Sequence, residues 1–169
     1  MARESIILIG MPASGKSTIG KILSAELGYD FVDLDVYIQE KAQQPLQEII
    51  DSLGEAALMQ LEKKRMEEIS LPGKVIAPGG SLVFHTELME QLRRQAVIVY
   101  LNESLSSLET RLKNAATRGI IGLKGKSLAE IYAERTPLYN RYADIIIDST
   151  RLTRRQIVAE IKQQFHRLS

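Results

Sequence analysis

Residues 6–18 read I-I-L-I-G-M-P-A-S-G-K-S-T, and this stretch decides the fold. Four apolar residues, Ile6–Ile9, run directly into a glycine-rich turn, and a helix with apolar residues at helical spacing is predicted over Lys16–Leu27. Gly10–Ser17 matches the pattern G-x-x-x-x-G-K-[ST] at every defined position. Because a buried strand enters the turn and an amphipathic helix leaves it, the pattern indicates a phosphate-binding loop rather than an incidental glycine turn.

The spacing of this loop predicts its chemistry. Four residues between the two glycines let the backbone wrap a phosphate group, and the following helix adds its N-terminal dipole and free N–H groups. Lys16 is expected to reach the β- and γ-phosphates as a catalytic residue, and the Ser17 hydroxyl is expected to bind Mg²⁺. The predicted nucleotide-binding residues of the loop are Gly10, Pro12, Ala13, Ser14, Gly15, Lys16, Ser17 and Thr18. We therefore expect ATP and Mg²⁺ as cofactors.

Composition excludes several classes of protein. The chain has 169 residues, of which 44% are hydrophobic and 25% charged, as expected for one globular domain spanning residues 1–169. A formal charge of +1 gives no support for binding nucleic acid through a basic face. Without cysteine, disulfides are excluded and a reducing compartment is favoured. No segment has the form of a signal peptide or approaches the ~20 apolar residues of a membrane span, so we expect a cytoplasmic protein without a membrane partner.

Apolar runs alternate with helical stretches along the whole chain. The expected strands are Ile6–Ile9, Phe31–Leu34, Lys74–Ala77, Ala96–Leu101 and Ala143–Ile147. The expected helices are Lys16–Leu27, Val36–Ile69 with breaks near Pro45 and Gly54, Glu87–Arg94, Glu103–Lys113 and Arg155–Arg167. This order predicts an α/β fold with a five-stranded parallel sheet covered on both faces. Two stretches are not strands of the sheet or simple connections between strands. Residues 35–69 are expected to form an inserted helical region, and residues 114–127 a lid loop.

The tripeptide Asp33-Leu34-Asp35 ends the second expected strand. Alternation along an extended segment sends both carboxylates to the same side, and ligands of open α/β sheets bind beyond the carboxyl ends of the strands. One carboxylate is then placed to hold Mg²⁺ through water, and the other to accept a proton or a hydrogen bond from a substrate hydroxyl. The alternative is that Asp35 only caps the helix that follows it.

Further motifs follow in order along the chain. They are Gly54-Glu55, Val75–Gly80, Arg111 with Arg118, and Arg135–Tyr139. Together with the phosphate loop and Asp33-x-Asp35, this set resembles the shikimate kinase family, in the nucleoside-monophosphate-kinase-like branch of P-loop enzymes. The resemblance runs from Ile6 to about Ser149. It implies a three-layer P-loop NTPase fold with strand order 2-3-1-4-5, and a monomer that passes the γ-phosphate of ATP to a hydroxyl of shikimate or a related hydroxy acid.

The resemblance also implies roles for single residues. Asp33 would lie near Mg²⁺ as a metal residue with Ser17, while Asp35 would bind the acceptor hydroxyl and act as a catalytic base. Gly79 and Gly80 would contact the substrate ring, and Arg135 would clamp the substrate carboxylate. Arg118 would be the catalytic lid arginine that closes on the phosphates. Arg111 would pack against adenine as a nucleotide-binding residue.

One position departs from the family's pattern. An arginine that also grips the acceptor carboxylate usually follows the Gly-Glu turn, and Met59 stands in its place. Methionine cannot donate a hydrogen bond, and losing a charged contact to a bound carboxylate typically costs roughly two to three orders of magnitude in affinity. The expected ATP half of the site is therefore intact, while the acceptor half is altered. Lys63, one helical turn after Met59, is a candidate to reach inward in its place.

Two alternatives therefore stay open beside a shikimate-kinase-like enzyme. The first is a kinase of the same fold that acts on another small hydroxylated acceptor, such as a gluconate-like molecule or another polyol. The second is a nucleotide-binding module without transfer activity. The joint presence of Asp33, Asp35, Arg118 and Arg135 argues against the second alternative, because nucleotide binding by itself requires no acceptor site.

Overall fold

A computed structural model describes residues 2–114, 122 and 125–169 of the chain. Its centre is a parallel sheet of five strands, β1 (Ile6–Ile9), β2 (Asp30–Asp33), β3 (Lys74–Ala77), β4 (Val97–Asn102) and β5 (Ile145–Asp148). The strand order is β2-β3-β1-β4-β5, as the family resemblance implies. The expected α/β class and sheet are confirmed, with strand ends that differ from expectation by two residues at most.

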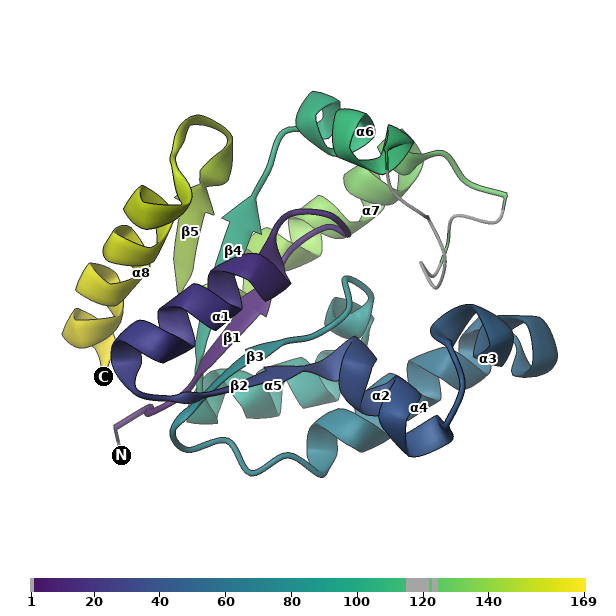
Figure 1. The fold of residues 1–169 in the computed structure, drawn as a ribbon, viewed down its shortest axis with the longest axis horizontal. Helices are drawn as coiled ribbons and strands as arrows, with labels where there is room; N and C mark the ends of the chain where they lie inside the picture. The colour runs from purple at the N-terminus through teal and green to yellow at the C-terminus, as the bar shows by residue number, and fades with distance from the viewer. Residues whose placement is uncertain (1, 115–121, 123–124) are drawn as a thin grey trace.

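Helices connect the strands and cover the sheet (Figure 1). They are α1 (Lys16–Leu27), α2 (Leu34–Ala42), α3 (Leu46–Leu53), α4 (Glu55–Glu67), α5 (Thr86–Gln95), α6 (Leu105–Lys113), α7 (Leu128–Tyr142) and α8 (Arg154–Leu168). Two short 3₁₀ turns, Leu82–Phe84 and Ser149–Arg151, lie beside the site described below. Among the residues described here, none of the helices combines the length and the apolar character that a membrane crossing requires.

The side chains of β1 show how the layers form. Ile6 and Leu8 join one buried apolar cluster with residues of α1 and α8, whereas Ile7 and Ile9 join a second cluster with residues of α5 and α7. This division follows from the alternation of side chains along a strand. Figure 1 shows α1 and α8 on the near face of the sheet, with α5 and α7 behind it. A central strand that is apolar on both faces therefore specifies the three layers.

The region predicted as one interrupted helical stretch consists of three helices, α2, α3 and α4, which project to one side of the sheet in Figure 1. Pro45 precedes α3 in an extended conformation, and its ring cannot continue a helix. Gly54 ends α3 and begins α4 with a φ of 89°, which favours glycine over other residues. The two breaks expected at these residues are confirmed.

Helix α7 is not among the helices expected from the sequence. Ser127 caps its start, because the Ser127 hydroxyl accepts a hydrogen bond from the backbone N–H of Glu130 at 3.1 Å. Pro137 lies inside the helix, where proline removes a backbone donor and usually obscures a helical pattern. Burial of Ile131, Tyr139 and other residues of one face against the sheet favours the helix despite that loss.

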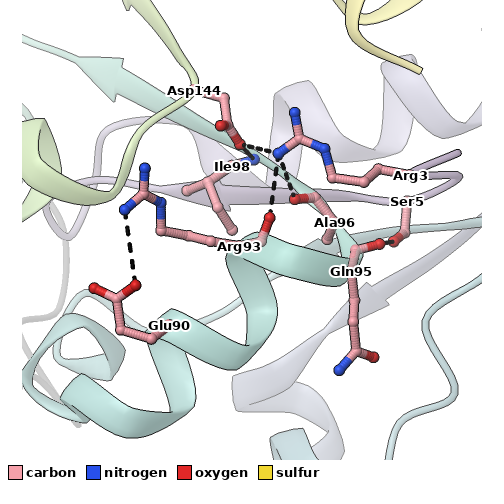
Figure 2. Close-up of polar contacts among 8 residues, drawn as sticks. All are labelled: Arg3, Ser5, Glu90, Arg93, Gln95, Ala96, Ile98 and Asp144. Atoms are coloured by element: carbon pink, nitrogen blue, oxygen red, sulfur yellow. Dashed lines mark hydrogen bonds and ion pairs between the residues drawn. The ribbon is translucent and has the colours of Figure 1, made fainter. Parts of the chain in front are cut away.

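A polar network fastens the amino-terminal ends of the strands, opposite the site (Figure 2). The Asp144 carboxylate accepts hydrogen bonds from the Arg3 guanidinium and from the backbone N–H of Ile98, each at 2.9 Å. Arg3 also donates to the carbonyl oxygens of Arg93 and Ala96, at 3.2 and 3.4 Å. The network joins the chain start, the end of α5 and the beginnings of β4 and β5, so it holds four separate segments in register.

Candidate active site

A cavity of about 700 Å³ opens at the carboxyl ends of β1, β2 and β3. One part of its wall is the phosphate loop with Ser17, and another part contains Asp35, Gly79, Gly80 and Arg135. Ligand sites of open α/β sheets lie at this end of the strands. The tertiary structure therefore brings both predicted halves of the site to one cavity.

The geometry of the phosphate loop explains its glycines. Gly15 has a φ of 93° immediately before α1, a conformation that side chains with a Cβ rarely adopt. A Cβ on Gly10 would lie 2.9 Å from the carbonyl oxygen of Leu101, so only glycine fits there. The buried hydroxyl of Ser14 has no hydrogen-bond partner among the described residues. A phosphate oxygen is a suitable partner for such a group, which fits the anion expected from the sequence.

Lys16 is buried beneath the loop and donates to the carbonyl oxygens of Gly10 and Met11, both at 2.8 Å. Burial lowers the pKa of the Lys16 ammonium group to about 8, and the nearby negative charge of Asp35 opposes that shift. The cation is therefore placed inside the cavity wall, in a surrounding where the charge of a phosphate group would be strongly attractive.

The two oxygen ligands expected for the metal, from Ser17 and Asp33, lie next to each other. The Ser17 hydroxyl donates to Asp33 Oδ2 at 2.5 Å. Mg²⁺ is usually held by one or two protein oxygens together with phosphate oxygens and water, so this hydroxyl–carboxylate pair fits the ion. The described residues contain no cluster of three or more carboxylate, histidine or cysteine ligands.

The prediction about the Asp33–Asp35 segment is wrong in one detail. Helix α2 begins at Leu34, and its cap is Asp33, whose Oδ1 accepts hydrogen bonds from the backbone N–H groups of Asp35 at 3.0 Å and Val36 at 3.2 Å. The capping role considered for Asp35 thus belongs to Asp33, because the strand ends one residue earlier than expected. Strand alternation does not apply to Asp35, yet both carboxylates line the cavity.

Asp35 has the electrostatics of a group that exchanges protons near neutral pH. Burial is the main cause that raises the pKa of its carboxyl group to about 6, and the charge of Asp33 raises it further. The positive charge of Lys16 opposes both effects. A carboxylate with this pKa is mostly ionised at pH 7 and still basic enough to accept a proton.

The Gly79-Gly80 turn lies between the charged groups of the acceptor half. A Cβ on Gly79 would stand 2.9 Å from Glu62 Oε1 and 3.3 Å from Asp35 Oδ1. A Cβ on Gly80 would stand 2.9 Å from an Arg135 guanidinium nitrogen. A side chain at either position would displace one of these charged groups, so the two glycines let the charged side chains lie close to the backbone of the turn.

Arg135 comes from the unexpected helix α7 and is only 2% exposed. Its guanidinium carbon lies 5.5 Å from the centre of the Phe84 ring, a distance typical of a cation–π contact. One turn later, the Tyr139 hydroxyl donates to the carbonyl oxygen of Gly80 at 2.7 Å. Helix α7 thus attaches both the arginine and the glycine turn to the same wall of the cavity.

The structure adds Glu62, which the sequence analysis did not assign to the site. Its side chain lies in the cavity wall, is 3% exposed, and accepts a hydrogen bond through Oε2 from the Ser81 hydroxyl at 2.6 Å. Burial raises the pKa of the Glu62 carboxyl group to about 7, although the Ser81 hydrogen bond opposes the shift. A signal for Glu62 exists in the sequence, because it falls on the buried stripe of α4 between Leu58 and Met66.

The remaining expected residues have different outcomes. Arg111 lines the cavity and donates from Nη1 to the carbonyl oxygen of Ala13 in the phosphate loop at 2.8 Å. Arg118 and most of the expected lid at 114–127 lie outside the described residues. Met59 is partly buried and packs against the apolar cluster on the α5 and α7 face of the sheet.

Comparison with known proteins agrees with this geometry. The family model for shikimate kinase matches residues 12–166. The shikimate kinase of Sulfurihydrogenibium sp. is 34% identical over 165 residues, which cover 97% of this chain and 99% of the relative. A shikimate kinase from Acinetobacter baumannii, solved in complex with shikimate, superposes with a TM-score of 0.86 at 26% identity and covers 97% of this chain and 93% of its own. A gluconokinase from Sinorhizobium meliloti 1021 has a TM-score of 0.62 at 17% identity over 99% of this chain and 95% of its own, which shows a shared fold. The chain therefore belongs to the shikimate kinase family, whose members are phosphotransferases that act on an alcohol group.

Proposed function

We propose that this protein transfers the γ-phosphate of ATP to a hydroxyl group of shikimate or of a closely related hydroxy acid. One observation carries the proposal: a single cavity joins the phosphate loop to Asp35, Gly79, Gly80 and Arg135. Nucleotide binding would not require the second group of residues. Membership of the family and the cavity that joins both halves also argue against a nucleotide-binding module without transfer activity.

The nucleotide half would bind ATP with Mg²⁺. Backbone N–H groups of residues 10–18 would surround the β- and γ-phosphates, and Lys16 would neutralise their charge. Ser17 and Asp33 would hold Mg²⁺, which supplies further neutralisation of the phosphate oxygens when bound. Arg111, which lies against this loop, would contact the nucleotide.

The acceptor half would position the hydroxyl and remove its proton. Asp35, with a pKa of about 6, is mostly ionised at neutral pH and would accept the proton of the acceptor hydroxyl. The hydroxyl oxygen would form the new bond to the γ-phosphorus as the bond to the β-phosphate oxygen breaks, which leaves ADP. Arg135 would pair with the acceptor carboxylate through its planar fork of donors.

Because of Met59, a second class of acceptor remains a candidate. With a methionine where the family usually has an arginine, the acceptor half holds fewer charged donors, so a polyol or gluconate-like acceptor stays in competition with shikimate. The high structural similarity to a shikimate-bound relative favours shikimate.

An acceptor panel tests the proposal. ADP release is measured with shikimate, gluconate, other polyols and no acceptor, each with ATP and Mg²⁺. We expect saturation by shikimate within the usual enzyme range of about 1 μM to 1 mM, and a kcat/KM that rises through about pH 6 as Asp35 ionises. Saturation by gluconate instead of shikimate would refute the proposed acceptor.

A pair of aspartate variants tests the role of the base. Asp35→Asn keeps the size of the side chain and removes its basicity, so kcat should fall by about 10²- to 10⁴-fold. Asp30→Asn is the matched control, because Asp30 is exposed at the far end of β2 and should leave kcat unchanged. Full activity of the Asp35 variant would refute this part of the mechanism.

Other parts of the proposal concern the chain as a whole. We propose one kinase domain over residues 1–169, with a substrate-binding insertion at about 35–69 and a lid at about 114–127 that carries Arg118 to the phosphates. Exclusion of water by such a lid would favour transfer over hydrolysis of ATP. The family resemblance supports a monomer, and a cytoplasmic location agrees with the demand for ATP.

A further inference from the structure

A buried carboxylate that has no part in the proposed chemistry lies at the nucleotide end of the cavity. Glu103 directly follows β4, is 2% exposed and belongs to the cavity wall. Its Oε2 accepts hydrogen bonds from the Ser149 hydroxyl at 3.0 Å and from Arg111 Nη2 at 3.2 Å. Its Oε1 is buried and has no hydrogen-bond partner among the described residues.

Arg111 is held from two sides as a result. Nη2 pairs with Glu103, while Nη1 donates to the carbonyl oxygen of Ala13 and lies 4.0 Å from the position that a Cβ of Gly15 would take. The guanidinium group thus lies against the phosphate loop. The Arg111 side chain is 45% exposed, whereas that of Glu103 is 1% exposed. A long and partly exposed side chain is therefore held at its tip by a buried carboxylate.

Elements of the sheet and the start of α6 support Glu103. Glu103 lies between the end of β4 and the cap of α6, and Ser149 follows the neighbouring strand β5. The Ser104 hydroxyl accepts a hydrogen bond from the backbone N–H of Ser107 at 3.2 Å and so fixes the start of α6. Binding groups supported by packed elements lose less conformational freedom when a ligand arrives than groups on free side chains.

Stability alone does not explain a glutamate at this position. A buried carboxylate pays a desolvation penalty, and a buried oxygen without a partner adds to it. Apolar residues of similar volume often replace buried ion pairs without loss of stability, or with a gain. The retained charge is therefore best explained by what it does to Arg111.

We propose that Glu103 is a positioning residue for nucleotide binding, which holds the Arg111 guanidinium against the phosphate loop before the nucleotide arrives. The inference rests on the nucleotide half of the proposed function and is independent of the acceptor. It assigns to Glu103 no contact with the nucleotide itself, since the carboxylate acts through the arginine.

Equilibrium binding of a non-hydrolysable ATP analogue with Mg²⁺, measured by calorimetry, tests the proposal on the full chain. Glu103→Met keeps an unbranched side chain of similar length and removes the charge. We expect the dissociation constant to rise about tenfold, equivalent to about 1.4 kcal/mol. Glu103→Gln keeps an oxygen that can accept from Arg111, so its constant should stay within about threefold of the parent. Glu109→Gln, an exposed change on α6, should bind as the parent does.

Thermal unfolding of the same variants separates positioning from support of the fold. Glu103→Met leaves the buried Ser149 hydroxyl without its acceptor, so we expect it to lose some stability and also to bind the nucleotide more weakly at a temperature where it is fully folded. A residue needed only for folding would show a lower melting temperature with nucleotide binding unchanged, and that result would overturn the proposal.

A double-mutant cycle supplies the decisive measurement. If Glu103 acts through Arg111, then Glu103→Met should add nothing to the loss caused by Arg111→Ala, whereas independent roles would give additive losses. Full additivity would overturn the inference. The titration needs no acceptor, so a failure to phosphorylate shikimate would refute the proposed acceptor and leave this test intact. A parent chain that binds no nucleotide would refute both.

Discussion

Glu62→Gln is a sharp test of the electrostatics in the acceptor half. The Glu62 carboxyl group is 3% exposed, and its Oε2 accepts a hydrogen bond from Ser81 at 2.6 Å. Glutamine keeps the shape and one oxygen that can accept this hydrogen bond, and it removes the ionisation. Any change in stability that depends on pH can then be assigned to the charge.

The sign and size of the effect follow from the pKa of Glu62. Burial raises this pKa from the ordinary value of 4.5 to about 7. The protonated group contributes stability that is fully present below about pH 4.5 and is lost as the pH rises through about 7, because the unfolded chain ionises first. At 1.36 kcal/mol per pH unit, the loss is about 1 kcal/mol at pH 5 and about 3 kcal/mol at pH 8. Glu62→Gln should therefore exceed the parent in stability by about these amounts.

Urea unfolding of the ligand-free protein between pH 5 and pH 8 measures the difference directly. Glu67→Gln is the matched control, because it makes the same chemical change at an exposed position near the end of the same helix. A gap between Glu62→Gln and the parent that stays constant with pH would refute the reasoning. A variant less stable than the parent at pH 8 would show that the ionised carboxylate is favourably paired, and would refute it as well.

Two further substitutions test other parts of the molecule. Met59→Arg restores a guanidinium three residues before the buried glutamate on α4, so the KM for shikimate should fall about tenfold or more in steady-state assays, while the exposed change Gln60→Arg should leave it unchanged. An unaltered KM in the first variant would contradict the account of this position. Asp144→Ala removes the acceptor shared by Arg3 and Ile98, so unfolding should cost about 1–3 kcal/mol less in urea, with kcat unchanged. Parental stability would contradict the role given to the network in Figure 2.

Local sequence was enough to predict the phosphate loop and the strands of the sheet. The phosphate loop combines a short apolar strand, glycines with restricted geometry and a helix start within residues 6–27, so nearly all its determinants are neighbours in the chain. The same holds for β3, whose bounds were predicted without error because proline and glycine follow it directly. Helix α7 was missed because Pro137 opposes it locally, and burial of one face against the sheet, a non-local effect, favours it.

The acceptor half shows what local reasoning cannot supply. The role of Arg135 was expected only through the family resemblance, and its burial beside Phe84 depends on α7 packing against a distant segment. The positions of Asp33 and Asp35 were both expected, but their local roles were assigned on a strand placed one residue too late in the sequence. Because β2 ends one residue earlier than expected, Asp33 and not Asp35 caps α2. Only the hydrogen bonds of the folded chain decide where this helix begins.

The sequence by itself determined the fold class, the phosphate loop and the expected cofactors, because each depends on periodicity or on spacing along the chain. Only the tertiary structure decided that Glu62 and Glu103 are buried in the cavity wall. Burial, and with it the raised pKa of Glu62 and the fixed position of Arg111, arises from segments that are far apart in sequence. Desolvation and charge pairing depend on that three-dimensional surrounding, which no local pattern specifies.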